Sequence, residues 1–253
     1  MRIFLKTEDE IILLRAASQL ATRALIEVGR HVVPRLALSH LRNKVVNAVM
    51  RTVPTESNSG KEALSSDTEF TFFVNGAYIE PSLEGECMLC EGDWLTVNCW
   101  VCLDGYYSFG AHTFIVGSSQ DDEPMTSTLR DMLRQVVRRA SAGHSIKEIS
   151  RTVYSLHSHD PYVLLKTFGH GVGRNRVENP ILRMNPGVND TVLLKEGMCL
   201  VIALAFKHGR SHLIKPRLMH ESTFHNPFVP FGTTVVVRPG RPEILTSFET
   251  IVK

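Results

Sequence analysis

Apolar residues near the start of the chain recur at helical spacing. Successive members of this stripe lie three or four residues apart, as on one face of an amphipathic helix: Ile11, Leu14, Ala17, Ala21, Leu25 and Val28. Thr7 and Glu10 form a capping box that predicts the start of this helix. Gly29 predicts its end, and a second helix is expected over 38–51.

Alternation replaces helical spacing in the middle of the chain. FTFFVN (70–75) predicts a strand, and the segment 93–117 predicts a hairpin that turns at Asp104-Gly105. The first strand of the hairpin has one wholly apolar face, which we expect in the core: Leu95, Val97, Cys99, Val101 and Leu103. Its other face is mixed and could line a pocket: Trp94, Thr96, Asn98, Trp100 and Cys102.

The second half of the chain repeats this order of helices and strands. A polar linker (118–127) follows the hairpin, and two helices are expected within 129–156. Apolar runs then predict strands near 198–206, in GTTVVVR (232–238) and in EILTSF (243–248). Two halves of similar make-up indicate an α+β fold with a pseudo-duplication and a site in the cleft between the halves.

Composition indicates an ordinary soluble protein rather than a membrane or nucleic-acid protein. The 253 residues carry a net charge of +2, and no apolar run approaches the roughly 18 residues of a membrane span. The basic run RQVVRRA (134–140) predicts a solvated helix face, with nucleic-acid binding as the alternative. The start of the chain lacks signal-peptide features and the five cysteines are odd in number, so we expect a cytoplasmic protein with reduced thiols.

Six segments together resemble one known family. They occur in family order and with near-family spacing: KTEDEIILLRAASQLA, FVNGAYIEP, EGDWLTVNCWVCLDGYYSFGAHTFIVG, FGHGVGR, LLKEGMCLVIALAF and VVVRPGRPEILT. The chain resembles the methionine aminopeptidases of the creatinase/aminopeptidase family. The resemblance implies a single pita-bread domain over 1–253, with an N-terminal half of about 1–120 and a C-terminal half of about 121–253. Its curved antiparallel sheets would carry external helices.

The resemblance also implies a metal site whose ligands this chain lacks. The family holds two divalent metals with two Asp, one His and two Glu. By motif, the two Asp fall on Asn98 and Phe109, the His on His170, and the two Glu on Ala203 and Gly232. Hard divalent cations need anionic oxygen ligands, so this set predicts neither a metal pair nor another cofactor.

The two pocket histidines of the family are also replaced, by Glu80 and Val177. The resulting hypothesis is a catalytically inactive protein, a monomer that binds a peptide, an N-terminus or a protein partner in the former cleft. Its binding residues would be Glu80, Asn98, Phe109, His170 and Val177. Neither a nucleic acid nor a membrane is expected as partner.

Four alternatives stay open. The protein could be an active aminopeptidase with an altered metal site, or a metal-free hydrolase that uses Glu80 and His170. The pattern of Cys87, Cys90, Cys99 and Cys102 could bind zinc, although small buried side chains are the favoured interpretation. Four histidines between His208 and His225 could bind a metal, but the segment reads as a partner-binding or solvated loop.

Overall fold

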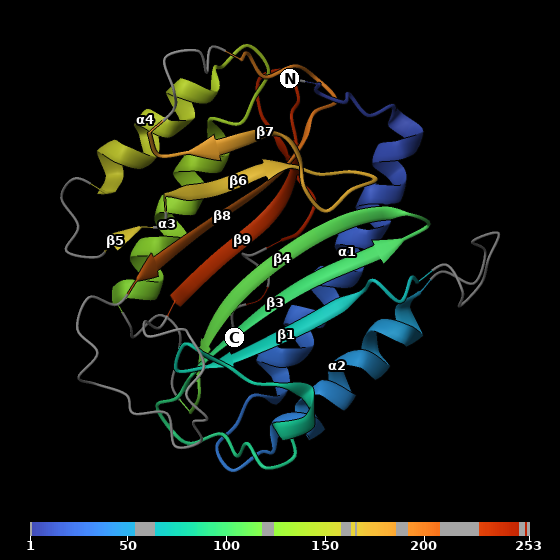
Figure 1. The fold of residues 1–253 in the computed structure, drawn as a ribbon, viewed down its shortest axis with the longest axis vertical. Coiled ribbons are helices and arrows are strands. Elements are labelled where there is room, and N and C mark those ends of the chain that lie inside the picture. Colours follow the sequence, from blue (N-terminus) through green and yellow to red (C-terminus); the bar gives the residue numbers. More distant parts are fainter. Residues whose placement is uncertain are drawn as a thin grey trace.

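The computed structural model describes residues 2–53, 64–117, 124–157, 163–164, 166–185, 192–207, 228–247 and 251. Helices and strands alternate in two rounds, as predicted (Figure 1). The helices are α1 Glu8–His31, α2 Leu38–Thr52, the 3-10 helix η2 Pro81–Leu83, α3 Pro124–Arg138 and α4 Ile146–His157. The strands are β1 Glu69–Val74, β2 Ala77–Tyr78, β3 Trp94–Leu103, β4 Tyr106–Ile115, β5 Val163–Leu164, β6 Thr167–Gly171, β7 Glu178–Arg183, β8 Cys199–Lys207, β9 Phe228–Val236 and β10 Glu243–Ile244.

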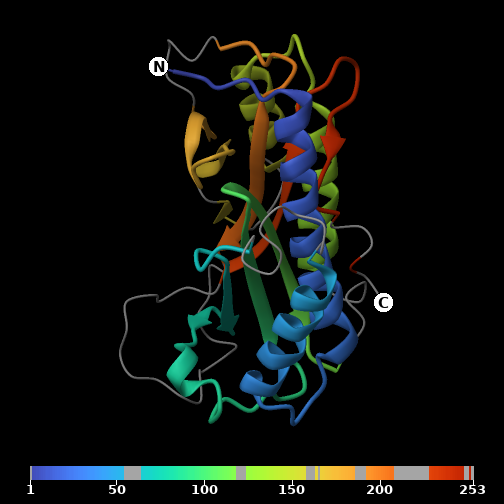
Figure 2. The ribbon, with the colours of Figure 1, turned by 90° about the vertical axis from the view of Figure 1, so that its right-hand side faces the viewer.

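The described strands form one antiparallel sheet that runs through both halves. Its order is β2-β1-β3-β4-β9-β8-β6-β7, with β10 paired to β9 and β5 paired to β8. Helix α1 packs on β3 and β4, and α3 packs on β8 and β9. These helices cover one face of the sheet, behind the strands in Figure 1 and beside them in Figure 2. The α+β prediction is confirmed.

Helix α1 begins as predicted but ends later. Thr7 and Glu10 make both bonds of the capping box, and the predicted apolar stripe is buried. The expected end at Gly29 is wrong, because the helix continues to His31. A Cβ on Gly29 would lie 3.2 Å from the ring of Phe114 and 3.1 Å from the carbonyl oxygen of Ile251. This glycine serves close packing inside the helix rather than termination.

The predicted hairpin is confirmed in turn and in register. Asp104 and Gly105 both have positive φ, as a two-residue primed turn requires. The apolar row of β3, from Leu95 to Leu103, is at most 2% exposed and packs in the main core with α1. The opposite side, which we call the site face, is lined by Asn98, Trp100 and Cys102 of β3 and by their β4 partners Ala111, Phe109 and Tyr107.

Two predicted element boundaries are wrong. Helix α3 starts at Pro124 instead of 129, because proline suits the first turn of a helix, where its missing N–H is not needed. The strand expected over 243–248 is limited to Glu243 and Ile244. The regular pairing ends there because the N–H groups of Leu245 and Thr246 both donate to the carbonyl oxygen of Thr234, at 2.8 and 3.3 Å.

The N-terminal and C-terminal parts of the sheet meet at a narrow seam between β4 and β9. A single residue pair, Ala111 with Gly232, is in register there. Beside it, the hydroxyl of Thr234 accepts from the backbone N–H of Phe109 and donates to its carbonyl oxygen, both at 2.9 Å. A threonine side chain therefore takes over the hydrogen bonds that a longer strand pairing would make, and it fixes the backbone of Phe109.

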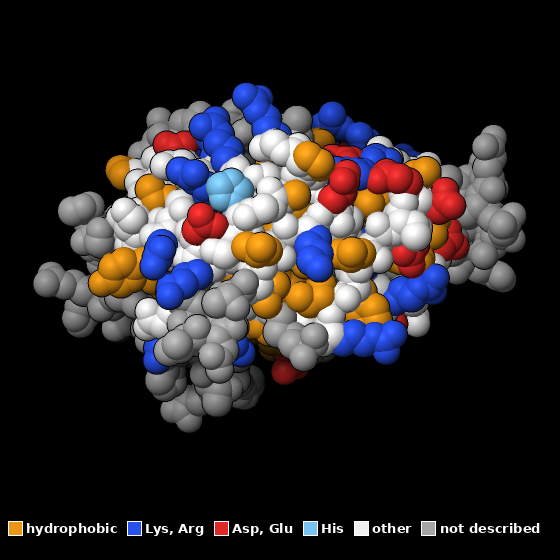
Figure 3. Space-filling model, turned by 90° about the horizontal axis from the view of Figure 1, so that it is seen from above, with side chains coloured by type: hydrophobic (Ala, Val, Ile, Leu, Met, Phe, Trp, Pro, Cys, Tyr) orange, Lys and Arg blue, Asp and Glu red, His pale blue; other side chains and the backbone are white. Residues whose placement is uncertain are grey.

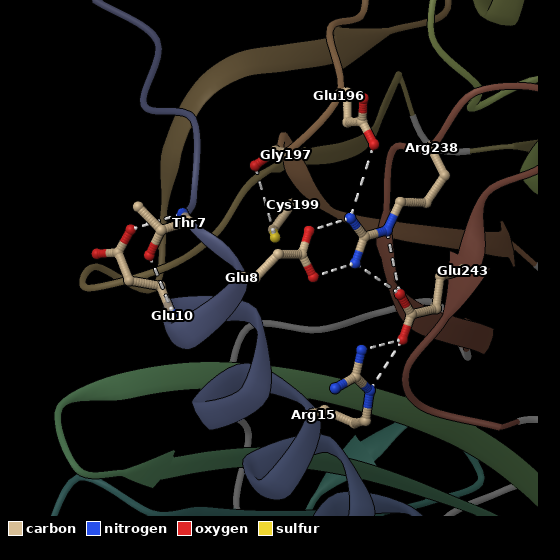
Figure 4. A network of polar contacts seen from close by, with 9 residues as sticks. All are labelled: Thr7, Glu8, Glu10, Arg15, Glu196, Gly197, Cys199, Arg238 and Glu243. Atoms are coloured by element: carbon tan, nitrogen blue, oxygen red, sulfur yellow. Dashed lines mark hydrogen bonds and ion pairs between the residues drawn. The ribbon is translucent and has the colours of Figure 1, made fainter.

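Two sets of ion pairs attach the start of the chain to the C-terminal half. Lys6 and Glu178 form a buried pair, with side chains 5% and 4% exposed. Near them, Arg238 pairs with Glu8 of α1 and with Glu243 of β10 (Figure 4). The hydrogen bond from Arg238 lowers the pKa of Glu8. The Arg238 pairs are more exposed and hence weaker than the buried pair.

The basic run that begins at Arg134 lies on the solvent side of α3 as predicted. Leu133, Val136 and Val137 are buried, while Arg138 and Arg139 are exposed. Seen from the end that carries α4 and the N-terminus, acidic side chains lie among the basic ones (Figure 3). The burial of the apolar residues and the exposure of Arg138 and Arg139 fit a solvated helix face. Within the described part of the chain, no helix is both long and apolar enough to cross a bilayer.

Candidate functional site

Three of the predicted ligand positions meet at one point of the site face. Gly232 of β9 lies opposite Ala203 of β8, and β9 adjoins β4, which carries Phe109 (Figure 1). A Cβ built on Gly232 would stand 2.7 Å from Cε1 of Phe109 and 3.0 Å from the Cβ of Ala203. The phenyl ring therefore fills the space above Gly232, and the sequence-predicted grouping of 109, 203 and 232 corresponds to a real cluster.

Asn98 lies in the same row of the sheet. It is paired with Ala111, which is itself paired with Gly232. The Oδ1 atom of Asn98 is buried and accepts no hydrogen bond from any residue that the structure describes. A buried amide oxygen without a donor costs about 1–3 kcal/mol, so Asn98 is a polar residue of this cluster whose hydrogen bonding is incomplete.

His170 presents a neutral imidazole near this cluster. Its Nδ1 donates to the carbonyl oxygen of Gly171 at 2.8 Å, which leaves Nε2 as an acceptor. Burial lowers the pKa of His170 below its usual value. The ring stacks on Trp100 with centroids 6.1 Å apart and planes 10° apart, and Trp100 also contacts Phe109 at 4.7 Å. Trp100 thus connects His170 to the cluster around Phe109.

The two positions of the family's pocket histidines lie farther out. The N–H of Ile79 donates to the carbonyl oxygen of Phe72, which sets the backbone of Glu80 level with Thr71, the partner of Asn98. Glu80 is exposed, and Val177, in the segment 172–177 between β6 and β7, is 58% exposed. Within the described ranges, no hydrogen bond joins Glu80 to His170.

Sequence reasoning missed Arg176, which extends from the segment 172–177 to the N-terminal half. Its guanidinium lies over Trp100 and Tyr107, 5.7 Å from each ring centroid, and donates to Glu69 at 2.9 Å. The run RNR at 174–176 was a signal of basic character. Only the folded chain reveals that its partners, among them Glu69 and Trp100, lie far earlier in the sequence.

The cysteine and histidine patterns are the other two candidate metal sites from the sequence. Cys87, Cys99 and Cys102 are buried and Cys90 is half-buried, and burial raises the pKa of the Cys87 thiol. Among the residues with a described placement, no three His, Cys, Asp or Glu side chains are grouped in a way that could hold a metal. The histidine cluster from His208 to His225 lies outside the described residues.

Comparison with known proteins adds a family to this geometry. The model of metallopeptidase family M24 matches residues 12–238. The methionine aminopeptidase of Helicobacter pylori (strain ATCC 700392 / 26695) is 28% identical over 225 residues, which cover 85% of this chain and 87% of that protein. The methionine aminopeptidase of Borreliella burgdorferi is 25% identical over 254 residues, which cover 97% of this chain and 98% of that protein.

Solved structures share the fold. The methionine aminopeptidase from Thermotoga maritima superposes with a TM-score of 0.79 at 20% identity, over 97% of this chain and 100% of that one. A prolidase from Pyrococcus furiosus superposes with a TM-score of 0.72 at 18% identity, over 97% of this chain and 66% of that one. The predicted pita-bread fold is confirmed.

Proposed function

Because this chain belongs to metallopeptidase family M24, we propose that it is a non-catalytic member that binds a peptide or a protein N-terminus on its site face. The observation that carries the proposal is the position of the Phe109 ring against Gly232 and Ala203. An apolar ring fills the place where the resemblance puts carboxylate ligands. A hydrolytic metal pair would have to occupy that same space.

The side chains at this place do not fit the family's two metals. Positions 98, 109, 203 and 232 offer an amide, a phenyl ring, a methyl group and a hydrogen atom. Two divalent cations close together need several carboxylates to offset their mutual repulsion. Of the five ligand positions, only His170 supplies a metal-binding atom, a single nitrogen. These four side chains and one imidazole therefore do not fit a pair of divalent metals.

What remains on the site face suits binding. Trp100 and Phe109 give apolar area, while Nε2 of His170 and Oδ1 of Asn98 are acceptors for a ligand. Apolar walls with a few polar groups are usual for ligand sites. Glu80 adds an acid at the level of Asn98, which favours a ligand with a free amine.

The runner-up is a hydrolase, either with a relocated metal or with Glu80 and His170 as acid and base. His170 is neutral and its Nε2 has the lone pair that a base needs. The separate positions of Glu80 and His170 favour the binding proposal. Turnover of a Met-Ala-Ser peptide by the purified protein distinguishes the two. Measurable release of methionine that a Glu80→Gln substitution abolishes would establish the hydrolase.

We expect folding to be independent of divalent metal. If no metal binds the native state, then EDTA has no binding energy to remove. The melting temperature in an excess of EDTA, about 5 mM, should equal the melting temperature without EDTA. Elemental analysis should find far less than one equivalent of manganese, cobalt, iron or zinc. Two bound equivalents, or a large drop in melting temperature with EDTA, would contradict the proposal.

Binding of an N-terminal amine should depend on Glu80. Calorimetry with short peptides is expected to show tighter binding of the free than of the acetylated form. Glu80→Gln should weaken the free form about tenfold, as the loss of a hydrogen bond between charged groups predicts. Glu86→Gln serves as a matched control, since Glu86 is an exposed acid beyond η2. Equal affinity for both peptide forms would exclude recognition of the amine.

A further inference from the structure

The groups that surround the guanidinium of Arg176 all come from a distant part of the sequence. Its guanidinium lies 5.7 Å from the ring centroids of both Trp100 and Tyr107. One terminal nitrogen donates to Glu69 Oε2 at 2.9 Å, and the other donates to the carbonyl oxygen of Asp67. The two aromatic faces, the carboxylate and the carbonyl all come from residues 67–107, in the N-terminal half.

Contacts other than those with Arg176 also hold the residues that carry these four groups. The hydroxyl of Tyr107 donates to a carboxylate oxygen of Asp67 at 2.6 Å, and this bond raises the pKa of Tyr107 to about 12. Thr71 donates to the second oxygen of Glu69 at 3.0 Å. Trp100 is fixed by the stacked ring of His170 and by Phe109. The residues around the guanidinium of Arg176 therefore have contacts that do not depend on Arg176.

We propose that Trp100, Tyr107 and Glu69 form a binding site for the side chain of an arginine in a partner peptide, which displaces Arg176. This inference deepens the proposed function, because it names a side chain that a bound peptide would carry. A guanidinium fits better than an ammonium, since it is planar, stacks on aromatic faces and presents parallel donors to two acceptors. The hydrogen bond from Arg176 lowers the pKa of Glu69, so the carboxylate is charged at neutral pH.

The contacts of Arg176 are exposed enough for an arginine from solution to compete for them. The side chains of Arg176 and Glu69 are 36% and 52% exposed, so water and solutes reach the pair. Val177, the next residue, is 58% exposed, so Arg176 is reached from solvent on that side as well. A tethered arginine competes at an effective concentration of order millimolar, which lowers the apparent affinity for any arginine supplied from outside.

The test measures binding of N-acetyl-arginine amide through the fluorescence of Trp100. The chain has two tryptophans, so a Trp94→Phe background leaves Trp100 as the sole reporter. In that background, Arg176→Ala should bind the probe at least tenfold more tightly than the parent. Glu69→Gln added to Arg176→Ala should remove this gain, and N-acetyl-citrulline amide, which lacks the charge, should not bind.

Arg174→Ala is the matched control. Arg174 lies in the same segment, but its guanidinium is over Tyr106 at 4.7 Å and near Glu10, so its removal should leave the affinity for the probe unchanged. Arg176→Gln, which keeps the first part of the side chain but lacks the guanidinium, gives a second variant if alanine perturbs the fold. Equal affinity with and without Arg176, in both variants, would overturn the proposal. So would equal binding of the citrulline probe.

This outcome is separable from that of the proposed function. The probe has a blocked N-terminus and contacts residues 67–107, so it does not report on recognition of an amine by Glu80. Loss of the arginine effect with retained binding of free N-termini would remove the arginine site alone. If the arginine probe binds as expected but free N-termini do not, the arginine site stands and recognition of the N-terminal amine is excluded.

Discussion

Replacing Phe109 with alanine is expected to lower the free energy of unfolding by about 3–5 kcal/mol, the range measured for Phe→Ala in packed interiors. The ring is 8% exposed and contacts Trp100 and the space above Gly232. Removing it leaves a cavity, because Gly232 and Ala203 have no side-chain atoms that could move in. Urea unfolding followed by circular dichroism measures the loss.

Val177→Ala is the control for this measurement. Val177 is 58% exposed, so its truncation should change stability by less than about 0.5 kcal/mol. Phe109→Leu should fall between the two, because it keeps part of the apolar volume. A Phe109→Ala protein with the unfolding midpoint of the parent would show that the ring is not packed against Gly232.

Removing the carboxylate of Glu178 should destabilise the protein by a similar amount, about 3–5 kcal/mol. Its partner Lys6 is 5% exposed, so Glu178→Gln leaves a buried ammonium without a counter-charge. The pair also joins the start of the chain to β7, and Glu178 accepts a further bond from the backbone of Asn175. Urea unfolding of Glu178→Gln tests the expected loss.

A double substitution separates the charge effect from lost packing. Lys6→Met with Glu178→Leu removes both charges and should recover most of the stability, since a buried ion pair replaced by apolar groups is often neutral. Glu196→Gln is the control, because Glu196 is 58% exposed where it approaches Arg238. A loss for Glu178→Gln no greater than that for Glu196→Gln would contradict the interpretation of a buried, interdependent pair.

Local signals account for the parts of the fold that the sequence predicts well. The capping box at Thr7 and the turn at Asp104-Gly105 depend on residues within four positions of each other, and both are confirmed. Alternation along β3 also assigns its buried face correctly. Errors arise where a distant contact decides the outcome, as at Gly29, which packs against Phe114 instead of ending the helix.

The candidate site also has residues that the sequence predicts and contacts that it does not. Spacing within motifs led to 109, 203 and 232, and these positions do meet. The contact of Arg176 with Trp100 was not predictable, because it joins two halves of the chain and rests on side-chain geometry alone. The pair of Lys6 with Glu178 spans 172 residues of sequence, and no periodicity carries such information.

The contact between Phe109 and Gly232 also makes the residues at these two positions depend on each other. A larger residue at 232 cannot be accepted while the phenyl ring stands 2.7 Å from where its Cβ would be. An acid at 109 alone would open a cavity and place an unpaired charge in it, which is costly. Each single step towards carboxylates at these positions is therefore opposed by the residue at the other. Acids at both positions would therefore have to be introduced together, since either change alone is expected to lower the stability of the fold.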